Sequence, residues 1–241
     1  MKTERIRHNQ VGGADHGWLK AKHYFSFANY YNPSRMGFGA LRVINDDLIA
    51  AGTGFGTHPH RDMEIITIPL SGGVRHQDSA GHSGVVGPGE VQVMSAGSGI
   101  AHSEYNHSKE EPLSLFQIWI EPNKLDVKPR YDQKSFADQK PLNEWVTLVN
   151  PMGEISHGGL EIHQDAYLSR VHTSSASKVT YNLKKTRNGI FLLLVSGQIE
   201  IQGQVLETRD ALQVSEVSSI EIHSHKDSEV LVIEVPLTDY R

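Results

Sequence analysis

The chain has 241 residues, a formal net charge of −5 and no cysteine. The lack of cysteine excludes disulfide bonds, zinc sites built on thiolates, iron–sulfur clusters and cysteine nucleophiles. The negative charge argues against nucleic-acid binding, which needs a basic surface. The longest apolar run, Ile190 to Val195, is far shorter than the roughly 20 residues of a membrane helix. Because the first twenty residues also lack the apolar segment of a secretory signal, we expect a cytoplasmic protein without a membrane partner.

Short apolar segments, separated by glycine or proline turns, run through the first half of the chain. Residues 64–70 (EIITIPL) end at Ser71-Gly72-Gly73, and residues 91–94 follow the turn Gly87-Pro88-Gly89. Turns at such short intervals, with few helical periods, are typical of a β-sandwich or β-barrel. The sequence therefore predicts an all-β fold.

The second half of the chain repeats this rhythm. Residues 195–199 (VSGQI) echo residues 70–74 (LSGGV), and residues 232–236 (VIEVP) echo residues 118–122 (IWIEP). The spacing between matching segments changes along the chain, as it does when loops differ in length. We therefore expect two similar β-barrels in tandem.

The boundary between the two barrels is expected where the composition changes. Residues 123–143 are polar and contain two prolines, which indicates a connection. We accordingly assign residues 1–130 to an N-terminal barrel and residues 131–241 to a C-terminal one.

Histidine is the most unusual feature of the composition. The chain has 14 histidines, and six of them lie between His58 and His107. Without cysteine, imidazole and carboxylate are the remaining strong ligands for a transition metal. A single histidine is most often a surface residue, so the clustering carries the argument.

His58-Pro59-His60 is the first candidate ligand pair. Residues i and i+2 of a strand project to the same face, so both imidazoles can point into one barrel. Glu64 has the same parity and would face the same way if the strand were regular. Pro59 favours the start or the edge of a strand for this pair.

His102-Ser103-Glu104 is the second candidate, with the same spacing and a preceding Gly97-Ser98-Gly99 turn. If the two pairs lie on neighbouring strands, three imidazoles and one carboxylate converge. Such a set suits a divalent iron, manganese, nickel or copper ion and leaves two octahedral positions open for substrate and dioxygen.

Three motifs resemble the pirin family of the cupin superfamily. They are residues 58–65 (HPHRDMEI), residues 95–106 (SAGSGIAHSEYN) and residues 116–122 (FQIWIEP), in the pirin order and at pirin spacings. Residues 17–30 (GWLKAKHYFSFANY) resemble the family as well. The resemblance is strongest over residues 12–122, and it is nearest to the short bacterial pirin-like proteins described as quercetin 2,3-dioxygenases.

This resemblance implies a bicupin of two jelly-roll-like barrels with one metal ion, held in the N-terminal barrel by His58, His60, His102 and Glu104. Iron(II) is the family's usual metal, with manganese, nickel, copper, cobalt or zinc as alternatives. In many other cupins the ligand carboxylate follows the histidine pair closely, which here would be Glu64. The pirin pattern favours Glu104, and Glu64 then orients a ligand imidazole from behind.

The second barrel offers no equivalent ligand set. An offset of 125 residues places Leu183 and Lys185 where His58 and His60 stand in the first barrel. His223-Ser224-His225 has ligand spacing but lacks a partner strand to complete a site, so we expect it at a surface turn.

The resemblance implies a dioxygenase that cleaves flavonols such as quercetin and releases carbon monoxide, with Glu104 as general base. One alternative is an iron-dependent regulator that binds a protein partner without turnover. Another is a cupin enzyme that acts on a different small molecule.

The sequence does not identify the residues that contact substrate. Residues 75–79 (RHQDS) could donate hydrogen bonds at the barrel mouth or form an exposed hairpin. One aromatic group fits core or interdomain packing better than a polyphenol pocket; it comprises Trp18, Tyr24, Phe25, Phe27, Tyr30 and Tyr31.

Overall fold

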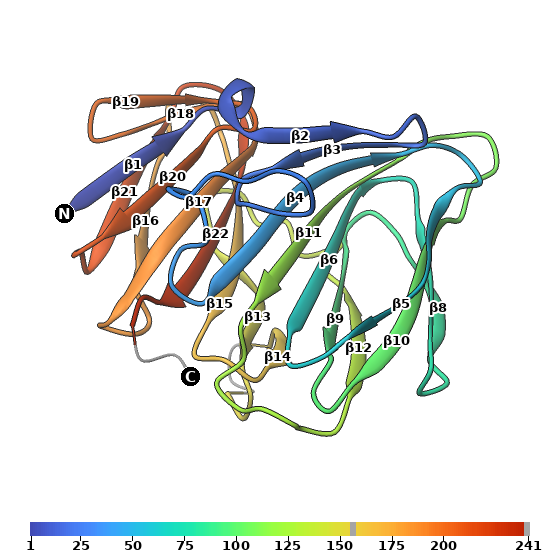
Figure 1. Ribbon diagram of the computed structural model, residues 1–241. Coiled ribbons are helices and arrows are strands. Elements are labelled where there is room, and N and C mark those ends of the chain that lie inside the picture. Colours follow the sequence, from blue (N-terminus) through green and yellow to red (C-terminus); the bar gives the residue numbers. More distant parts are fainter. Residues whose placement is uncertain (155–157, 239–241) are drawn as a thin grey trace.

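The computed structural model describes residues 1–154 and 158–238, and it is built almost entirely from β-strands (Figure 1). Within these residues the only helical element is a short 3-10 turn, η1 (His8–Gln10). The predicted all-β class is therefore confirmed. No helix in the described part of the chain has the length and apolar character needed to cross a membrane.

The first half of the chain forms a barrel from a large and a small antiparallel sheet. The large sheet has the order β12-β9-β6-β11-β4-β3-β2, and the small one β5-β10-β7-β8. Their bounds are β2 (Gly12–Asp15), β3 (Leu19–His23), β4 (Leu41–Ile49), β5 (Gly54–His60), β6 (Glu64–Ser71), β7 (Val74–Asp78), β8 (Ser83–Val86), β9 (Glu90–Ser95), β10 (Ile100–Asn106), β11 (Leu113–Ile120) and β12 (Arg130–Ser135).

The second half, joined by β1 from the start of the chain, forms a similar barrel, in which only β13 and β14 pair in parallel among the described strands. Its large sheet has the order β1-β20-β17-β22-β15-β13-β14, and its small sheet β16-β21-β18-β19. Their bounds are β1 (Lys2–Ile6), β13 (Val146–Pro151), β14 (Leu160–Ile162), β15 (Tyr167–Thr173), β16 (Lys178–Asn182), β17 (Asn188–Ser196), β18 (Gln198–Ile201), β19 (Gln204–Glu207), β20 (Ala211–Ser215), β21 (Ser219–Ser224) and β22 (Ser228–Pro236).

The strand orders confirm the internal repeat. The run β9-β6-β11-β4 of the first large sheet matches β20-β17-β22-β15 of the second, and the two small sheets match strand for strand. The echoing segments therefore occupy equivalent places. A single offset of 125 does not hold through the loops, because β16, which takes the place of β5, ends at Asn182, before Leu183.

β12 and β1 lie outside this repeat, next to β9 and β20 respectively. β1, at the start of the chain, pairs with β20 of the second barrel, from Lys2 opposite Ser215 to Ile6 opposite Ala211. β12 lies within residues 123–143, the segment expected to connect the barrels, and it pairs with β9 of the first barrel. Each large sheet is thus extended at the same edge by a strand from outside its repeat.

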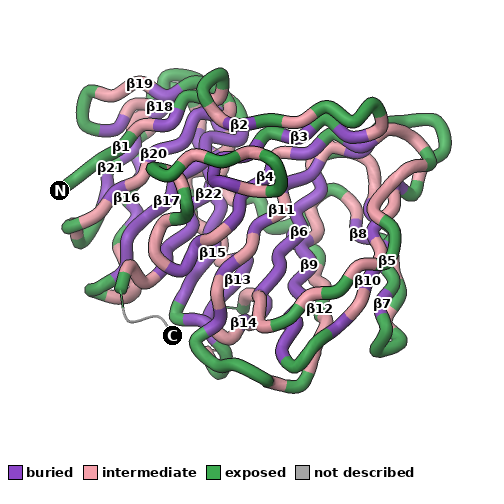
Figure 2. Tube along the Cα trace, in the orientation of Figure 1, coloured by how far each residue is buried: buried purple, intermediate pink, exposed green. Residues whose placement is uncertain are grey.

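The two large sheets face each other across a shared apolar core. One continuous cluster of buried side chains joins Ile66 and Ile118 of the first barrel to Phe191 and Ile233 of the second. In Figure 2 the buried segments concentrate where β4, β11 and β6 approach β17, β22 and β15. The molecule therefore has four layers, with a small sheet on each outside.

Aromatic side chains form much of the interdomain contact. Tyr24 and Phe25 are buried, and their ring centroids lie 6.1 Å and 5.5 Å from that of Phe191. Interdomain packing is therefore confirmed for these two aromatic residues. Tyr31, by contrast, is exposed.

Replacement of Phe191 by alanine should destabilise both barrels together, because its ring contacts the first barrel from the second. We expect a loss of about 3–5 kcal/mol in the free energy of unfolding, the usual cost of removing a buried aromatic ring. Urea unfolding followed by tryptophan fluorescence measures it, with the exposed Tyr31→Ala as control. A Phe191→Ala loss no larger than that of the control would contradict the shared core.

Candidate metal centre

Strands β5 and β10 lie side by side in the small sheet of the first barrel and bring the two histidine motifs together. Their antiparallel register places His102 opposite His58 and Ile100 opposite His60. Along β10 the side chains of His102 and Glu104 are both buried, since residues two apart share a face. The register shifts between His102 and Glu104, which marks a bulge at the site.

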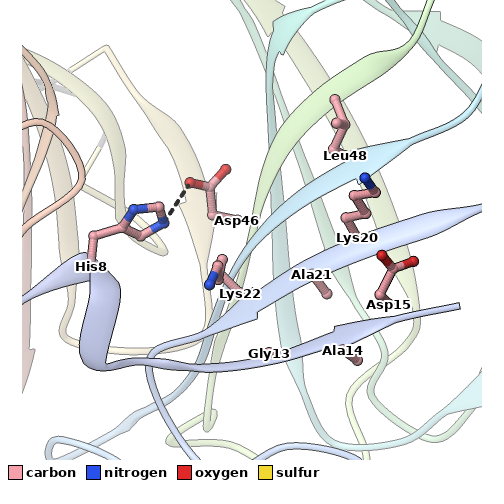
Figure 3. A pocket seen from close by; sticks show the side chains of 9 residues that line it. All are labelled: His8, Gly13, Ala14, Asp15, Lys20, Ala21, Lys22, Asp46 and Leu48. Carbon is pink, nitrogen blue, oxygen red and sulfur yellow. Dashed lines mark ion pairs between the residues drawn. The ribbon is translucent and has the colours of Figure 1, made fainter. Parts of the chain in front are cut away.

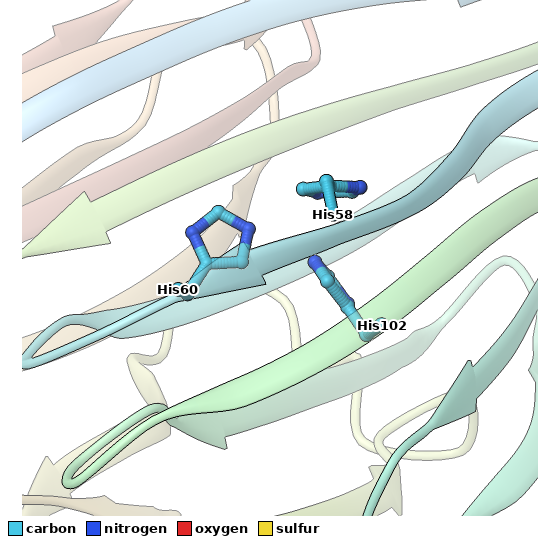
Figure 4. A group of neighbouring side chains, drawn as sticks. All are labelled: His58, His60 and His102. Atoms are coloured by element: carbon cyan, nitrogen blue, oxygen red, sulfur yellow. The ribbon is translucent and has the colours of Figure 1, made fainter.

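Three imidazoles converge from these two strands (Figure 4). The ring centroids of His58 and His102 lie 4.5 Å apart, and that of His60 lies 4.9 Å from each of them. One ring nitrogen from each histidine lies within 4.8 Å of the other two. The structure thus brings together the three histidines that the sequence singles out.

The imidazoles of His60 and His102 are in the form that binds metal. Burial, with the neighbouring His102 and His58, lowers the pKa of His60 to about 4. Burial, with the neighbouring His58 and His76, lowers the pKa of His102 to about 3. Both rings are therefore neutral at physiological pH and carry a free lone pair.

His58 has its orientation set by the backbone. Its Nδ1 lies 2.8 Å from the carbonyl oxygen of Gly56, which can only accept, so Nδ1 carries the proton. Nε2 is left as the nitrogen with the lone pair. A hydrogen bond from the second ring nitrogen to a carbonyl is the usual arrangement of a metal-binding histidine.

Glu104 is buried and held by side chains of the large sheet. Gln117 Nε2 donates to Glu104 Oε2 over 2.7 Å, and Thr67 Oγ1 lies 3.3 Å from Oε1. Trp119 Nε1 lies 3.4 Å from Gln117 Oε1, and because an indole only donates, this contact fixes which end of the amide faces Glu104. The carboxylate belongs to a second group of potential ligands, with His102 and His76.

The residues that hold Glu104 are part of a polar row across the inner face of the large sheet. The strand register aligns His23 with Asn45, Asn45 with Gln117, Gln117 with Thr67, and Thr67 with Gln92. Apolar clusters lie beside this row, one around Leu115 and Ile49 and one around Ile65 and Met94. The site is therefore a polar band between apolar walls.

His76 lies next to the site, although the sequence motifs did not single it out as a ligand. It alternates with Arg75 and Gln77 on β7, so that His76 and Asp78 are buried while their neighbours are exposed. The interpretation of residues 75–79 as an exposed hairpin is therefore wrong for His76 and Asp78. Strand parity in residues 74–78 is the signal that could have found them.

Unpartnered nitrogens show that the site fits a cation. Both ring nitrogens of His102 and Nδ1 of His76 are buried without a hydrogen-bond partner. Buried polar atoms are almost always paired, so such a cluster indicates a missing partner. A metal ion, which accepts imidazole lone pairs and attracts the Glu104 carboxylate, supplies one.

Glu64 lies elsewhere. It is the first residue of β6 in the large sheet, whereas His58 and His60 are on β5 of the small sheet, and the chain turns between them at Asp62, which has φ = 45°. The alternation of side chains along β5 therefore does not continue into β6, and Glu64 does not share a face with His58 and His60. Glu64 Oε2 accepts from Ser95 Oγ over 2.7 Å, and no hydrogen bond joins Glu64 to a ring nitrogen of either histidine.

A cavity of about 160 Å³ opens beside the imidazoles. His58, His60 and Glu104 line one part of it. Its other walls mix aromatic, aliphatic and polar side chains; they are Leu19, Ala21, His23, Phe27, Asn45, Asp47, Phe55, Gln117 and Trp119. Phe27 therefore contributes to a pocket as well as to packing, with its ring edge-on to Trp119 at 5.4 Å between centroids.

A larger but open groove of about 570 Å³ lies on the outer face of strands β2 to β4 (Figure 3). Its lining includes both positive and negative side chains, Lys20 and Lys22 together with Asp15 and Asp46. No residue of the imidazole cluster lines it. We therefore place the candidate site at the smaller cavity.

The interior of the second barrel is apolar where the first holds imidazoles. The equivalent strands β16 and β21 bury Val179, Tyr181, Ile220 and Ile222. The side chain of His223 is 38% exposed and lies 2.5 Å from Glu221. Among the described residues, both groups of potential metal ligands lie in the first barrel.

Comparisons with known proteins agree with this geometry. Two family models match the chain, Pirin over residues 4–120 and Quercetinase C-terminal cupin domain over residues 148–235. An Escherichia coli (strain K12) protein named quercetin 2,3-dioxygenase is 46% identical over 230 residues, 95% of this chain and 96% of its own. A Caulobacter vibrioides pirin-like protein is 43% identical over 231 residues, 96% of this chain and 98% of its own.

A solved structure shows the same fold. The crystal structure of the bacterial pirin YhhW from Escherichia coli in complex with nickel(II) superposes with a TM-score of 0.91 at 44% identity. The match covers 98% of this chain and 99% of that one.

Glu64 should make the stability of the protein depend on pH. Burial raises the pKa of Glu64 to about 7 from an ordinary value of 4.5, so the folded state retains a proton that the unfolded state releases. The stabilisation is complete below pH 4.5 and is lost as the pH rises through 7, by about 3 kcal/mol in all.

The isosteric Glu64→Gln variant should therefore match the wild type at pH 5 and be more stable at pH 9, as measured by urea unfolding. The exposed Glu110→Gln should show no such difference. Equal stability of wild type and Glu64→Gln at pH 9 would contradict the raised pKa of Glu64.

Proposed function

The chain belongs to the pirin family, and from this premise we propose that it is a metal-dependent dioxygenase that cleaves flavonols such as quercetin with release of carbon monoxide. The observation that carries the proposal is the convergence of three imidazoles on a small, largely apolar cavity. Relatives named quercetin 2,3-dioxygenase support the reaction class and the substrate.

We assign His58, His60, His102 and Glu104 as the ligands of one divalent transition metal, with iron(II) as the expected ion. His58 and His60 approach from β5, and His102 and Glu104 from β10. When bound, such an ion acts as a Lewis acid that lowers the pKa of a coordinated hydroxyl. On the neighbouring strand β7, Asp78 lies opposite His102 and His76 lies opposite Glu104.

Glu104 is the general base of this proposal. A flavonol must lose the proton of its 3-hydroxyl before its ring can be oxidised, and a carboxylate with one free lone pair can take it. Gln117 and Thr67 donate to the two oxygens of Glu104, so the carboxylate keeps one orientation. The apolar walls, including Phe27 and Trp119, exclude water from the activated ring.

Oxygen consumption with quercetin tests the function, on protein whose metal content has been quantified. We expect turnover in proportion to metal occupancy, and none in the double variant His58→Ala/His102→Ala, which lacks two of the imidazoles. A fully metallated, folded protein that consumes no oxygen would contradict the proposal. It would favour the regulator that binds a protein partner.

The Glu104→Gln variant tests the base. Glutamine retains an oxygen ligand but cannot take a proton, so we expect kcat to fall by about 10²–10⁴-fold with metal partly retained. Glu64→Gln is the matched control, a second buried glutamate of the same barrel, and its kcat should stay within about threefold. If Glu64→Gln instead lost metal and turnover while Glu104→Gln kept both, Glu64 would be the ligand carboxylate.

A further inference from the structure

Asp47 is a buried carboxyl group that neither the fold nor the metal ligands account for. It lies on β4, with 3% of its surface exposed, and it lines the same cavity as His58 and Glu104. Its Oδ1 atom is buried without a hydrogen-bond partner. The residues beside it on the neighbouring strands, Ala21 and Leu115, are apolar.

An unpartnered carboxyl group is costly at such a position. Of the other inward positions on the same strand, Val43 and Ile49 carry apolar side chains, and Asn45 is polar but hydrogen-bonded to His23. A buried polar group without a partner destabilises the folded state, and an aliphatic side chain of similar size would remove the cost. A residue kept at such a cost at the wall of a cavity indicates a ligand that pairs with it.

The surroundings favour a neutral partner. Burial, with the nearby Asp46 and Glu104, raises the pKa of Asp47 to about 8. At neutral pH its carboxyl is therefore mostly protonated, and it can both donate and accept a hydrogen bond. No lysine or arginine lines the cavity, so an anionic group would find no counter-charge there.

A second polar pair lies next to Asp47. His23 Nδ1 lies 2.8 Å from Asn45 Oδ1, which accepts, so the proton is on Nδ1 and Nε2 is an acceptor. His23 and Asn45 line the same cavity. Its volume of about 160 Å³ is close to that of a cavity known to hold a single benzene molecule, ~150 Å³. One ring of an aromatic substrate therefore fits.

We propose that Asp47 recognises a ring hydroxyl of the aromatic substrate within this cavity. The inference rests on the proposed function and names a contact within it. Asp47 would then determine substrate specificity. The protein should prefer flavonols that carry further hydroxyls, besides the 3-hydroxyl, over flavonols that carry the 3-hydroxyl alone.

The test compares quercetin with 3-hydroxyflavone, which keeps the 3-hydroxyl and lacks all the other hydroxyls of quercetin. The variants are Asp47→Leu, which removes the contact, and Asp47→Asn, which keeps a donor and an acceptor. Asp46→Asn is the matched control, because Asp46 is the adjacent residue on the other face of β4, where it pairs with Arg209. Both kcat/KM and the anaerobic Kd of the metal-loaded protein are measured for each flavonol.

We expect the ratio of kcat/KM for quercetin to that for 3-hydroxyflavone to fall at least about tenfold in Asp47→Leu, since the hydroxyl loses its partner. In Asp47→Asn and Asp46→Asn it should stay within about threefold. We also expect Asp47→Leu to raise Tm, whereas a purely structural role predicts a lower Tm. Turnover with an unchanged ratio in Asp47→Leu would overturn the inference and leave the proposed function intact.

The two proposals fail separately. If the metallated wild type consumes no oxygen with either flavonol, the proposed function fails. The inference about Asp47 is then decided by the Kd values. A preference for quercetin that Asp47→Leu abolishes supports it, and equal Kd values for both flavonols in the wild type overturn it.

Discussion

The antiparallel register between β5 and β10 is the constraint on which the site depends. With His58 opposite His102, three imidazoles reach one point from two strands. A shift of one residue would turn one strand's histidines to the outer face, because side chains alternate along a strand. The bulge between His102 and Glu104 adjusts this register locally, which is a common use of bulges beside active sites.

The two sheets of the first barrel contribute different side chains to the site. The small sheet supplies the imidazoles, and the large sheet supplies the polar row that holds Glu104 through Gln117 and Thr67. In the second barrel the same architecture buries apolar side chains such as Tyr181 and Ile222 at the corresponding strands. The same fold thus encloses a polar cavity in the first barrel and an apolar interior in the second. The buried cluster around Phe191 joins the two barrels.

The parts of the structure that follow from local periodicity were predictable from the sequence. The strands and the repeat are of this kind, whereas the common site of His58 and His102 was implied by the resemblance to the pirin family. Glu64 was misplaced because a positive φ at Asp62 ends the parity between β5 and β6. Gln117 and Asp47 were missed because a polar residue within an apolar strand acquires its meaning only from partners on other strands, which the sequence does not show.

The pairing of β1 with β20 has a consequence for how the protein is made. Lys2–Ile6 is synthesised well before its partner Ala211–Ser215. Until the second barrel has been synthesised, β1 has no edge to join, and contacts of such wide separation form slowly. While it is unpaired, β1 is also able to join the open β20 edge of another copy. Pairing of β1 with β20 of its own chain therefore competes with exchange of β1 between two copies.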